Sequence, residues 1–81
     1  MKLSIVTTEK TTEHEVKWVE LNTPIGNMVI QQKHVPMVVE LSPDKELLFE
    51  LGSGSKESMM ISQAVAHVTR SEVKILIPIK A

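Results

Sequence analysis

One stretch in the first half of the chain, Thr23-Pro24-Ile25-Gly26-Asn27-Met28-Val29-Ile30-Gln31-Gln32-Lys33-His34-Val35-Pro36, separates two sets of short apolar segments. It holds two of the four prolines, one of the three glycines and one of the three histidines. Its beginning, Asn22–Asn27, has the composition of a turn, because proline fixes φ and glycine or asparagine accepts a positive φ. The proline at its other end favours extended backbone in the residue before it. We therefore predict a turn, a short apolar run and a polar connection here, with strands on both sides.

The segment before this stretch predicts two strands. Leu3–Thr7 is the first, and Glu13–Leu21 is the second and longer one, with a threonine-rich polar connection between them. In the second strand the apolar residues share one face up to Trp18 and the opposite face from Val19 onward. Such a change of face indicates a β-bulge or a strand that passes from one sheet to another.

Strands and turns also alternate after the stretch. Met37–Leu41 alternates between core-facing and outward positions and predicts a half-buried strand. Ser42–Lys45 predicts a turn with proline in second position, as type I turns prefer. Gly52–Ser55 predicts the tip of a hairpin, and residues 73–80 show the longest strict alternation in the chain. Because turn signals recur every 8–12 residues or so, we predict an all-β fold, a flattened antiparallel sandwich or barrel of about 8–10 short strands.

One segment fits two kinds of secondary structure. Lys56–Val68 contains no glycine or proline, and the spacing of Ile61, Val65 and Val68 also suits a helix. Periodicity alone does not separate a strand from a helix in short apolar runs, so both interpretations stay open at this point.

Composition limits the classes of function. With 81 residues, we expect a single domain over residues 1–81. A net charge of −1, with scattered lysines and arginines, gives no electrostatic footprint for nucleic acid. The lack of cysteine excludes a disulfide scaffold and a catalytic thiol. The first residues do not have the pattern of a signal peptide, and no apolar run approaches the ~20 residues that a membrane helix needs.

No pattern of residues points to catalysis. The three histidines, His14, His34 and His67, are too far apart in sequence to form a local metal pair, so a metal site would require all three to converge in space. Gly52–Gly54 has neither the spacing of a nucleophile elbow nor that of a phosphate loop. We therefore expect no enzyme activity, no metal and no cofactor.

The methionines allow two interpretations. Filling the core is the default role of a dispersed methionine. Met28 and Met37 lie in and just after the stretch described above. If either side chain points outward, it would provide an adaptable contact surface, since methionine is enriched at interfaces.

Several segments resemble the ε subunit of F-type ATP synthases. That family has the pattern Thr-x-x-Gly-Asp/Glu-Phe-Gly-Ile-Leu-Pro-x-His-Ala-Pro-Leu-Val, and the residues that match it in register are Thr23, Gly26, Ile30, His34, Pro36 and Val38. Lys2–Thr7 followed by Glu13–Leu21 resembles the opening of the family. Three later segments also resemble parts of the family pattern: Leu41-Ser42-Pro43, Met59–Val68 and Glu72–Leu76. The resemblance covers nearly the whole chain and favours strands over a helix for residues 57–69.

The chain also departs from the family pattern. Val29 replaces the second glycine of the loop, Gln31-Gln32 replaces Leu-Pro, and Gln63-Ala64 replaces Gly-Gly. Glycine permits backbone conformations closed to these residues, so we expect a somewhat different backbone path. The family usually continues into a two-helix C-terminal domain, and since this chain stops at Ala81 we expect a short form or a diverged relative without that hairpin.

The resemblance implies a structural function. The corresponding domain is a non-catalytic rotor component that binds the γ subunit in the central stalk and seats it on the c-ring, in proton-driven ATP synthesis. It implies a peripheral place at the cytoplasmic face of the inner or plasma membrane, held by the complex and without insertion into the bilayer. The residues that it places near γ or the c-ring are Thr23, Gly26, Asn27, Met28, His34, Pro36 and Met37.

Two further expectations accompany this implied function. Asn27 replaces the usual acidic residue and so removes a charge that could meet polar c-ring loops. An exposed patch shaped for γ would let the isolated domain self-associate, because large apolar patches seldom stay bare. The alternative function is that of a diverged stand-alone protein-interaction β domain that is no longer part of a synthase.

Overall fold

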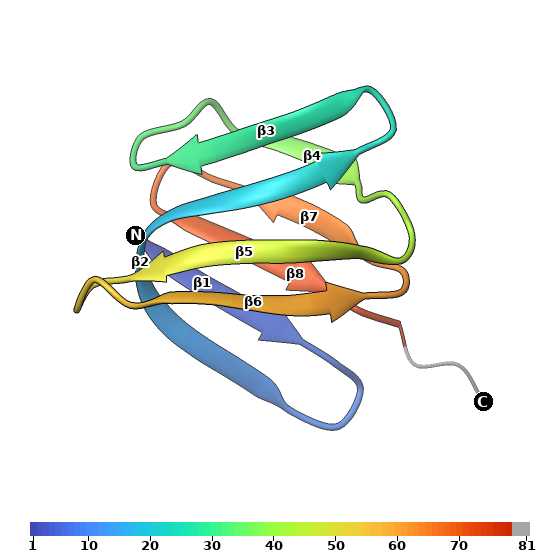
Figure 1. Cartoon of the computed structure of the whole chain (residues 1–81), viewed down its shortest axis with the longest axis horizontal. Coiled ribbons are helices and arrows are strands. Elements are labelled where there is room, and N and C mark those ends of the chain that lie inside the picture. The colour runs from blue at the N-terminus through green and yellow to red at the C-terminus, as the bar shows by residue number, and fades with distance from the viewer. Residues whose placement is uncertain (79–81) are drawn as a thin grey trace.

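The computed structural model describes residues 1–78, which form eight β-strands and no helix (Figure 1). The strands are β1 (Lys2–Val6), β2 (Thr11–Thr23), β3 (Gly26–Gln31), β4 (Met37–Glu40), β5 (Lys45–Leu51), β6 (Lys56–Ile61), β7 (Val65–Val68) and β8 (Glu72–Leu76). Since these residues hold no helix, none is present that is long and apolar enough to cross a membrane. The predicted all-β class is confirmed, and the number of strands is at the lower end of the predicted range.

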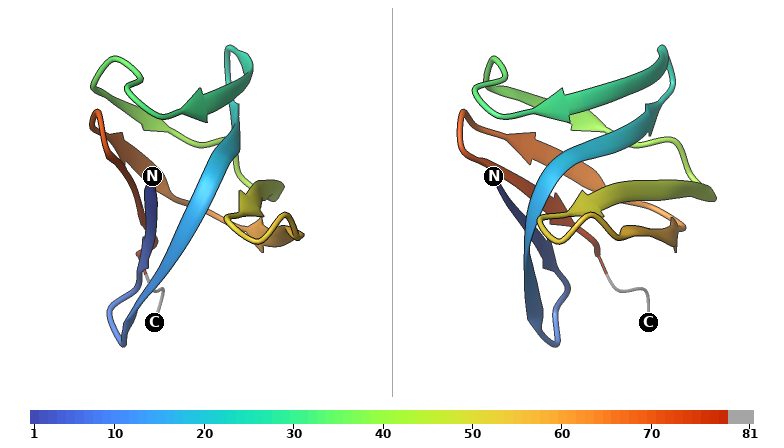
Figure 2. Two further views of the ribbon diagram at one scale, coloured as in Figure 1. Left: turned by 90° about the vertical axis from the view of Figure 1, so that its left-hand side faces the viewer. Right: turned by 60° about the vertical axis from the view of Figure 1, so that its left-hand side comes forward.

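The strands form a sandwich of two layers that share β2. One hydrogen-bonded path runs in the order β4-β7-β8-β1-β2-β5-β6, and β3 pairs with β2 beside that path. The first half of β2 completes sheet A, with β4, β7, β8 and β1, whereas its second half lies in sheet B, with β3, β5 and β6. Figure 2 shows β2 crossing from one layer to the other, so that the layers are closed on each other along this strand.

A β-bulge in β2 lets both halves of the strand face the core. The register of β2 against β5 shifts between Val16 and Trp18. Before the shift the buried side chain is Val16, and after it the buried side chains are Val19 and Leu21. The extra residue reverses the alternation at the point where the strand changes layer, as bulges commonly do. The predicted change of face is therefore confirmed, and bulge and sheet crossing occur together.

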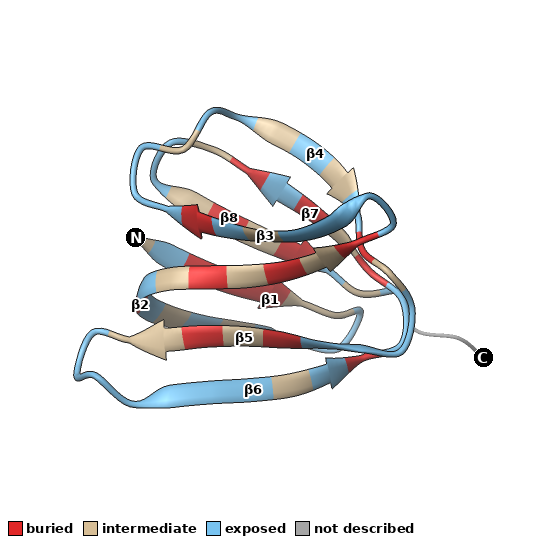
Figure 3. Ribbon diagram, turned by 45° about the horizontal axis from the view of Figure 1, so that its top comes forward, coloured by how far each residue is buried: buried red, intermediate tan, exposed pale blue. Residues whose placement is uncertain are grey.

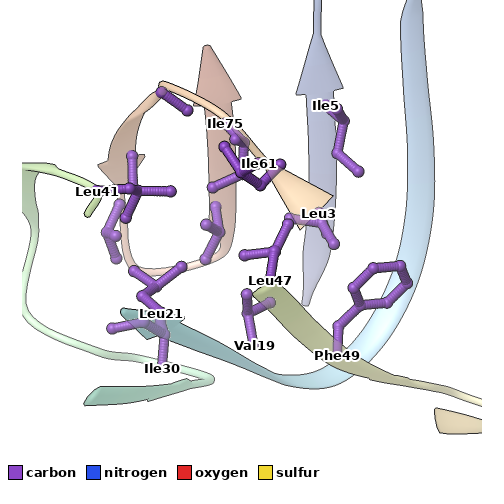
Figure 4. Packing of buried hydrophobic residues seen from close by; sticks show 14 of the residues in the cluster. Leu3, Ile5, Val19, Leu21, Ile30, Leu41, Leu47, Phe49, Ile61 and Ile75 are labelled. Carbon is purple, nitrogen blue, oxygen red and sulfur yellow. The ribbon is translucent and has the colours of Figure 1, made fainter. Parts of the chain in front are cut away.

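The core lies between the two layers and is aliphatic apart from one phenylalanine (Figure 4). Leu3 and Ile75 of sheet A face Val19, Leu47 and Phe49 of sheet B. In Figure 3 the buried positions alternate with intermediate ones along the second half of β5, as a sheet with one face in the core requires. Burial of aliphatic side chains contributes about 1.5–3 kcal/mol each, so this small core carries most of the stability.

One pairing differs from the predicted antiparallel arrangement. β1 and β8 run parallel, with Lys2 opposite Glu72 and Val6 opposite Leu76. Parallel neighbours need a crossover connection, and here six strands of the chain lie between the two partners. Local sequence patterns cannot reveal such a pairing, because both strands have the same alternation whichever way they run.

The structure decides the open questions of secondary structure. Lys56–Val68 forms β6 and β7, so the helix interpretation is wrong for this segment. The turn at Ser42–Lys45 exists, but Asp44 in its third position has a φ of 58°. A type I turn has a negative φ there, so the predicted turn type is wrong.

The residues that replace family glycines cause no unusual backbone. Among non-glycine residues of the described chain, only Lys33 and Asp44 have a positive φ. Val29 pairs with Glu20 in extended geometry, and Ala64 is buried. Their φ values are open to any residue, so the expected departure does not arise at these two substitutions.

Candidate functional site

The predicted interface residues lie at two opposite ends of the sandwich. Thr23, Gly26 and Asn27 lie at the strand ends that flank the turn between β2 and β3, whereas His34 and Pro36 lie in the loop that joins β3 to β4. Between them runs β3, whose six residues span about 17 Å at ~3.4 Å per step. In Figure 1 the first turn is at the upper right and the loop at the upper left. The stretch from Thr23 to Pro36, predicted as a turn, a short apolar run and a polar connection, therefore carries two separate surfaces joined by a strand.

The hairpin end, residues 22–27, is held by a dense set of hydrogen bonds. Thr23 pairs with Gly26, which leaves a turn of two residues, shorter than predicted. The Thr23 Oγ1 hydroxyl donates to the carbonyl of Gly26 at 2.7 Å and is itself buried. The amide of Asn27 donates to Glu20 Oε2 at 2.9 Å and to Asn22 Oδ1 at 3.2 Å. Gly26 has a φ of 130°, which L residues rarely adopt, so the glycine that matches the family pattern is required here.

The tip of this hairpin presents one apolar side chain. Ile25 is 89% exposed, more than any other large hydrophobic residue of the described chain. The neighbouring β4–β5 turn fixes the hairpin from the side, since Ser42 N donates to the Asn22 carbonyl at 2.8 Å. Ile25 was not singled out from the sequence, although an isoleucine after proline inside a predicted turn was the signal that could have found it. An isoleucine this exposed, on a turn held by hydrogen bonds, is available for contact with a partner.

The loop end, residues 31–36 and 69–71, is formed by two connections that lie against each other. Lys33 N donates to the Arg70 carbonyl at 2.8 Å, which joins the β3–β4 loop to the β7–β8 turn. His34 N donates to the Gln31 carbonyl at 3.2 Å, and His34 Nδ1 lies 2.8 Å from the Val35 carbonyl oxygen. The histidine that matches the family pattern therefore shapes its own loop, with its ring half-buried.

The two methionines of the predicted interface point toward the core. Met28 and Met37 are half-buried and pack against the core cluster, so core filling is the interpretation that the structure supports. Their neighbours point outward, with Val29 46% and Val38 67% exposed. Since successive side chains of a strand alternate between faces, the apolar residues available for contact lie one position away from the methionines.

The described residues hold no cluster of metal ligands but have a shallow, mainly apolar groove. Among residues 1–78, no group of three or more His, Asp or Glu side chains could hold a metal ion. His14 is half-buried, with its ring centroid 5.3 Å from that of Phe49, while His67 is exposed on β7. A shallow groove of about 390 Å³ on sheet A has a mainly apolar lining, formed by Val6, Thr7, Thr8, Val65, Leu76, Ile77 and Pro78. Its only polar side chains are the two threonines, and the Thr7 hydroxyl is engaged within its own loop, so the groove offers few of the polar groups that fix a small ligand in a binding pocket.

A family model matches the chain, and so do 49 chains of solved structures, of which two are described here. The model describes the β-sandwich domain of the ATP synthase delta/epsilon chain and matches residues 1–78. One structure, of the Euglena gracilis mitochondrial ATP synthase with OSCP, F1 and c-ring, contains a chain with a TM-score of 0.84 and 26% identity, covering 93% of this chain and 48% of that one. The other, the central stalk and c-ring of the Tetrahymena thermophila mitochondrial ATP synthase, contains a chain with a TM-score of 0.80 and 17% identity, covering 98% of this chain and 63% of that one.

The chain spans about half the length of the first solved chain and less than two thirds of the second. No curated protein sequence matches it significantly.

Proposed function

Because the chain belongs to the ATP synthase delta/epsilon chain family, as its β-sandwich domain, we propose that it is a non-catalytic component of a central stalk. In this proposal it binds the γ subunit and joins it to the c-ring, at the cytoplasmic face of the membrane that carries the synthase. It transmits torque by adhesion, and no bond is made or broken on it.

The observation that carries this proposal is the separation of the predicted contact residues into two ends of the sandwich. An adapter must touch two partners at once, and a strand of about 17 Å between the two surfaces allows this. The Tetrahymena structure that resembles this chain is of a central stalk with its c-ring, which fits such a position.

The architecture also suits a part that carries mechanical load. β2 is shared by both layers, and each layer is held by hydrogen bonds that continue from strand to strand. A force applied at one end is then resisted by a continuous network of backbone hydrogen bonds and by a packed core with low compressibility.

We assign the hairpin end to the c-ring and the loop end to γ. The hairpin end carries Ile25 at its tip, and residues 22–27 contain no charged side chain. Exposed large side chains on rigid turns act as anchors that fill pockets of a partner, and a few such residues dominate binding energy. Asn27, which stands where the family has an acid, is engaged in bonds to Glu20 and Asn22, so Ile25 is the side chain left for contact.

The assignment is tested by Ile25→Asp in a tagged full-length chain expressed in its own cells. We expect recovery of the c-ring from detergent-solubilised membranes to fall by about tenfold, the usual effect of losing an interface anchor, while recovery of γ changes little. Ile25→Leu, which keeps an apolar tip, is the matched control and retains c-ring recovery.

Other outcomes of this experiment lead elsewhere. Equal recovery of the c-ring with Ile25→Asp and with wild type would exclude the hairpin end as its contact. If the wild-type chain brings down neither γ nor the c-ring, the chain is a stand-alone interaction domain instead. That alternative has lost part of its support, because Val29 and Ala64 fit the fold without unusual φ values.

A further inference from the structure

We propose that the loop end recognises its partner by charge. Its surface is cationic and apolar, and it binds an apolar side chain of the partner that is flanked by carboxylates. The loop-end patch consists of Lys33, Val35, Val38 and Arg70, which come together where the β3–β4 loop meets the β7–β8 turn. The inference rests on the proposed function, in which the partner at this end is γ, and adds the chemistry by which γ is bound.

The first support is the pair of cations without an anion. Lys33 and Arg70 are exposed, and the backbone hydrogen bond from Lys33 N to the Arg70 carbonyl holds their main chains together. Within residues 1–78 the ion pairs use the amino terminus, Lys2 and Lys17, so neither cation of the patch is neutralised. A nearby acid, Glu72, accepts a hydrogen bond from the Ser4 hydroxyl at 2.8 Å and forms no ion pair with Arg70.

The second support is the apolar surface beside these cations. Val35 is 68% and Val38 67% exposed, and both lie within a few residues of Lys33 along the chain. Val38 pairs with His67 across β4 and β7, which places it on the outer face of sheet A next to the end that carries Arg70. Exposed apolar residues rimmed by charge are typical of a protein–protein contact rather than of free surface.

The third support is the backbone of Lys33. Its φ of 68° lies in the left-handed region, which a lysine seldom occupies. Glycine or asparagine would adopt this conformation with less strain. Unfavourable conformations that persist in a structure are concentrated at functional sites, so the lysine points to a use of its charge here.

The two ends of the molecule therefore use different chemistry. The hairpin end offers an uncharged tip, and its contact is expected to resist salt. The loop end offers two cations, whose attraction to carboxylates is screened as salt rises. The partner segment that fits the loop end has at least two acidic side chains placed around an apolar one.

The test measures binding of the full chain to the γ subunit in purified F1 that has been stripped of its own small stalk subunit. Between about 0.1 M and 1 M salt, where the Debye length falls from about 10 Å to about 3 Å, the affinity of the wild type is expected to fall at least tenfold. Lys33→Glu combined with Arg70→Glu is expected to weaken binding at low salt by at least tenfold and to remove most of the salt dependence, as for charge reversal in an interface.

A matched control separates local from general charge effects. Lys10→Glu combined with Lys45→Glu makes the same change in net charge at exposed positions outside the patch, and its binding is expected to stay within about twofold of wild type. Thermal unfolding of each variant checks that the fold is retained.

Each result decides between the two proposals. Binding that depends neither on salt nor on Lys33 and Arg70 overturns this inference and leaves the proposed function standing. Lack of wild-type binding at both salt concentrations overturns the proposed function. If the double reversal changes the mass of the isolated chain in light scattering but not its affinity for γ, the patch joins two copies of this chain and the inference is wrong.

Discussion

At the scale of single residues, the alternation of side chains along a β-strand decides whether a residue packs in the core or is exposed for contact with a partner. Met37 faces the core cluster, while Val38, the next residue of β4, is largely exposed. The same relation holds for Met28 and Val29 on β3. Residue type alone suggests the opposite assignment, because methionine is the residue usually associated with adaptable interfaces.

This alternation predicts opposite effects for one substitution at neighbouring positions. Met37→Asp is expected to lower the free energy of unfolding by about 2–4 kcal/mol, because it places a carboxylate against the core. Val38→Asp is expected to change it by less than about 0.5 kcal/mol, as at other exposed sites. Urea denaturation of both variants measures the difference, and similar losses at the two positions would show that β4 is packed in another register.

At the scale of elements, β2 determines the architecture. Its first half pairs with β1 and its second half with β3 and β5, so that a single strand closes the sandwich. The bulge between Val16 and Trp18 is needed because, in a strand with regular alternation, the apolar side chains of one half would face solvent instead of the core. Trp18 is thereby directed outward, where its Nε1 donates to Glu50 Oε1 at 2.6 Å.

Deletion of Lys17 tests the role of the bulge. Removing one residue restores a regular alternation and turns Val19 and Leu21 away from the core, where both are now fully buried. Burial of each side chain contributes about 1.5–3 kcal/mol, and the whole domain has only about 4–12 kcal/mol by the usual figure per residue. We expect the variant to be unfolded by circular dichroism.

An insertion elsewhere provides the control. One glycine added after Ser53 lengthens the exposed tip of the β5–β6 hairpin without a change of register in the strands, and is expected to cost less than about 1 kcal/mol. A folded Lys17 deletion variant would mean that the register of β2 can shift without loss of the core.

At the scale of the whole molecule, the shared strand makes the two layers one cooperative unit. Neither sheet can separate from the other without exposing the core that both cover. Because β2 belongs to both sheets, its loss from one sheet also disrupts the other. Unfolding is therefore expected to be two-state, as for most domains of this size.

The only tryptophan provides a probe of this cooperativity. Trp18 lies in sheet B, so its fluorescence reports on that layer, while far-UV circular dichroism reports on both. We expect the two signals to give the same midpoint in urea, with a slope of about 1 kcal/mol per molar, as suits a small domain. A circular dichroism transition that precedes the loss of tryptophan fluorescence would show that sheet A unfolds by itself.

The whole-molecule view also explains why the interface could not be placed from the sequence. Thr23, Gly26, His34 and Pro36 are close in the chain and match one family pattern, yet β3 carries the first pair to one end and the second pair to the other. The lysine and the arginine of the loop-end patch are 37 positions apart, since 70 − 33 = 37, and only the pairing of the loops unites them.

The sequence by itself determined the all-β class, most of the strands, the change of face in β2 and the family. These features depend on local alternation, turn residues and short patterns that are present in the order of the residues. The tertiary structure alone decided the parallel β1–β8 pairing, the inward direction of Met28 and Met37, the exposure of Ile25 and the union of Lys33 with Arg70. The physical reason is that strand pairing and burial join residues distant in sequence, and the free energy of such contacts depends on the whole chain rather than on any local window.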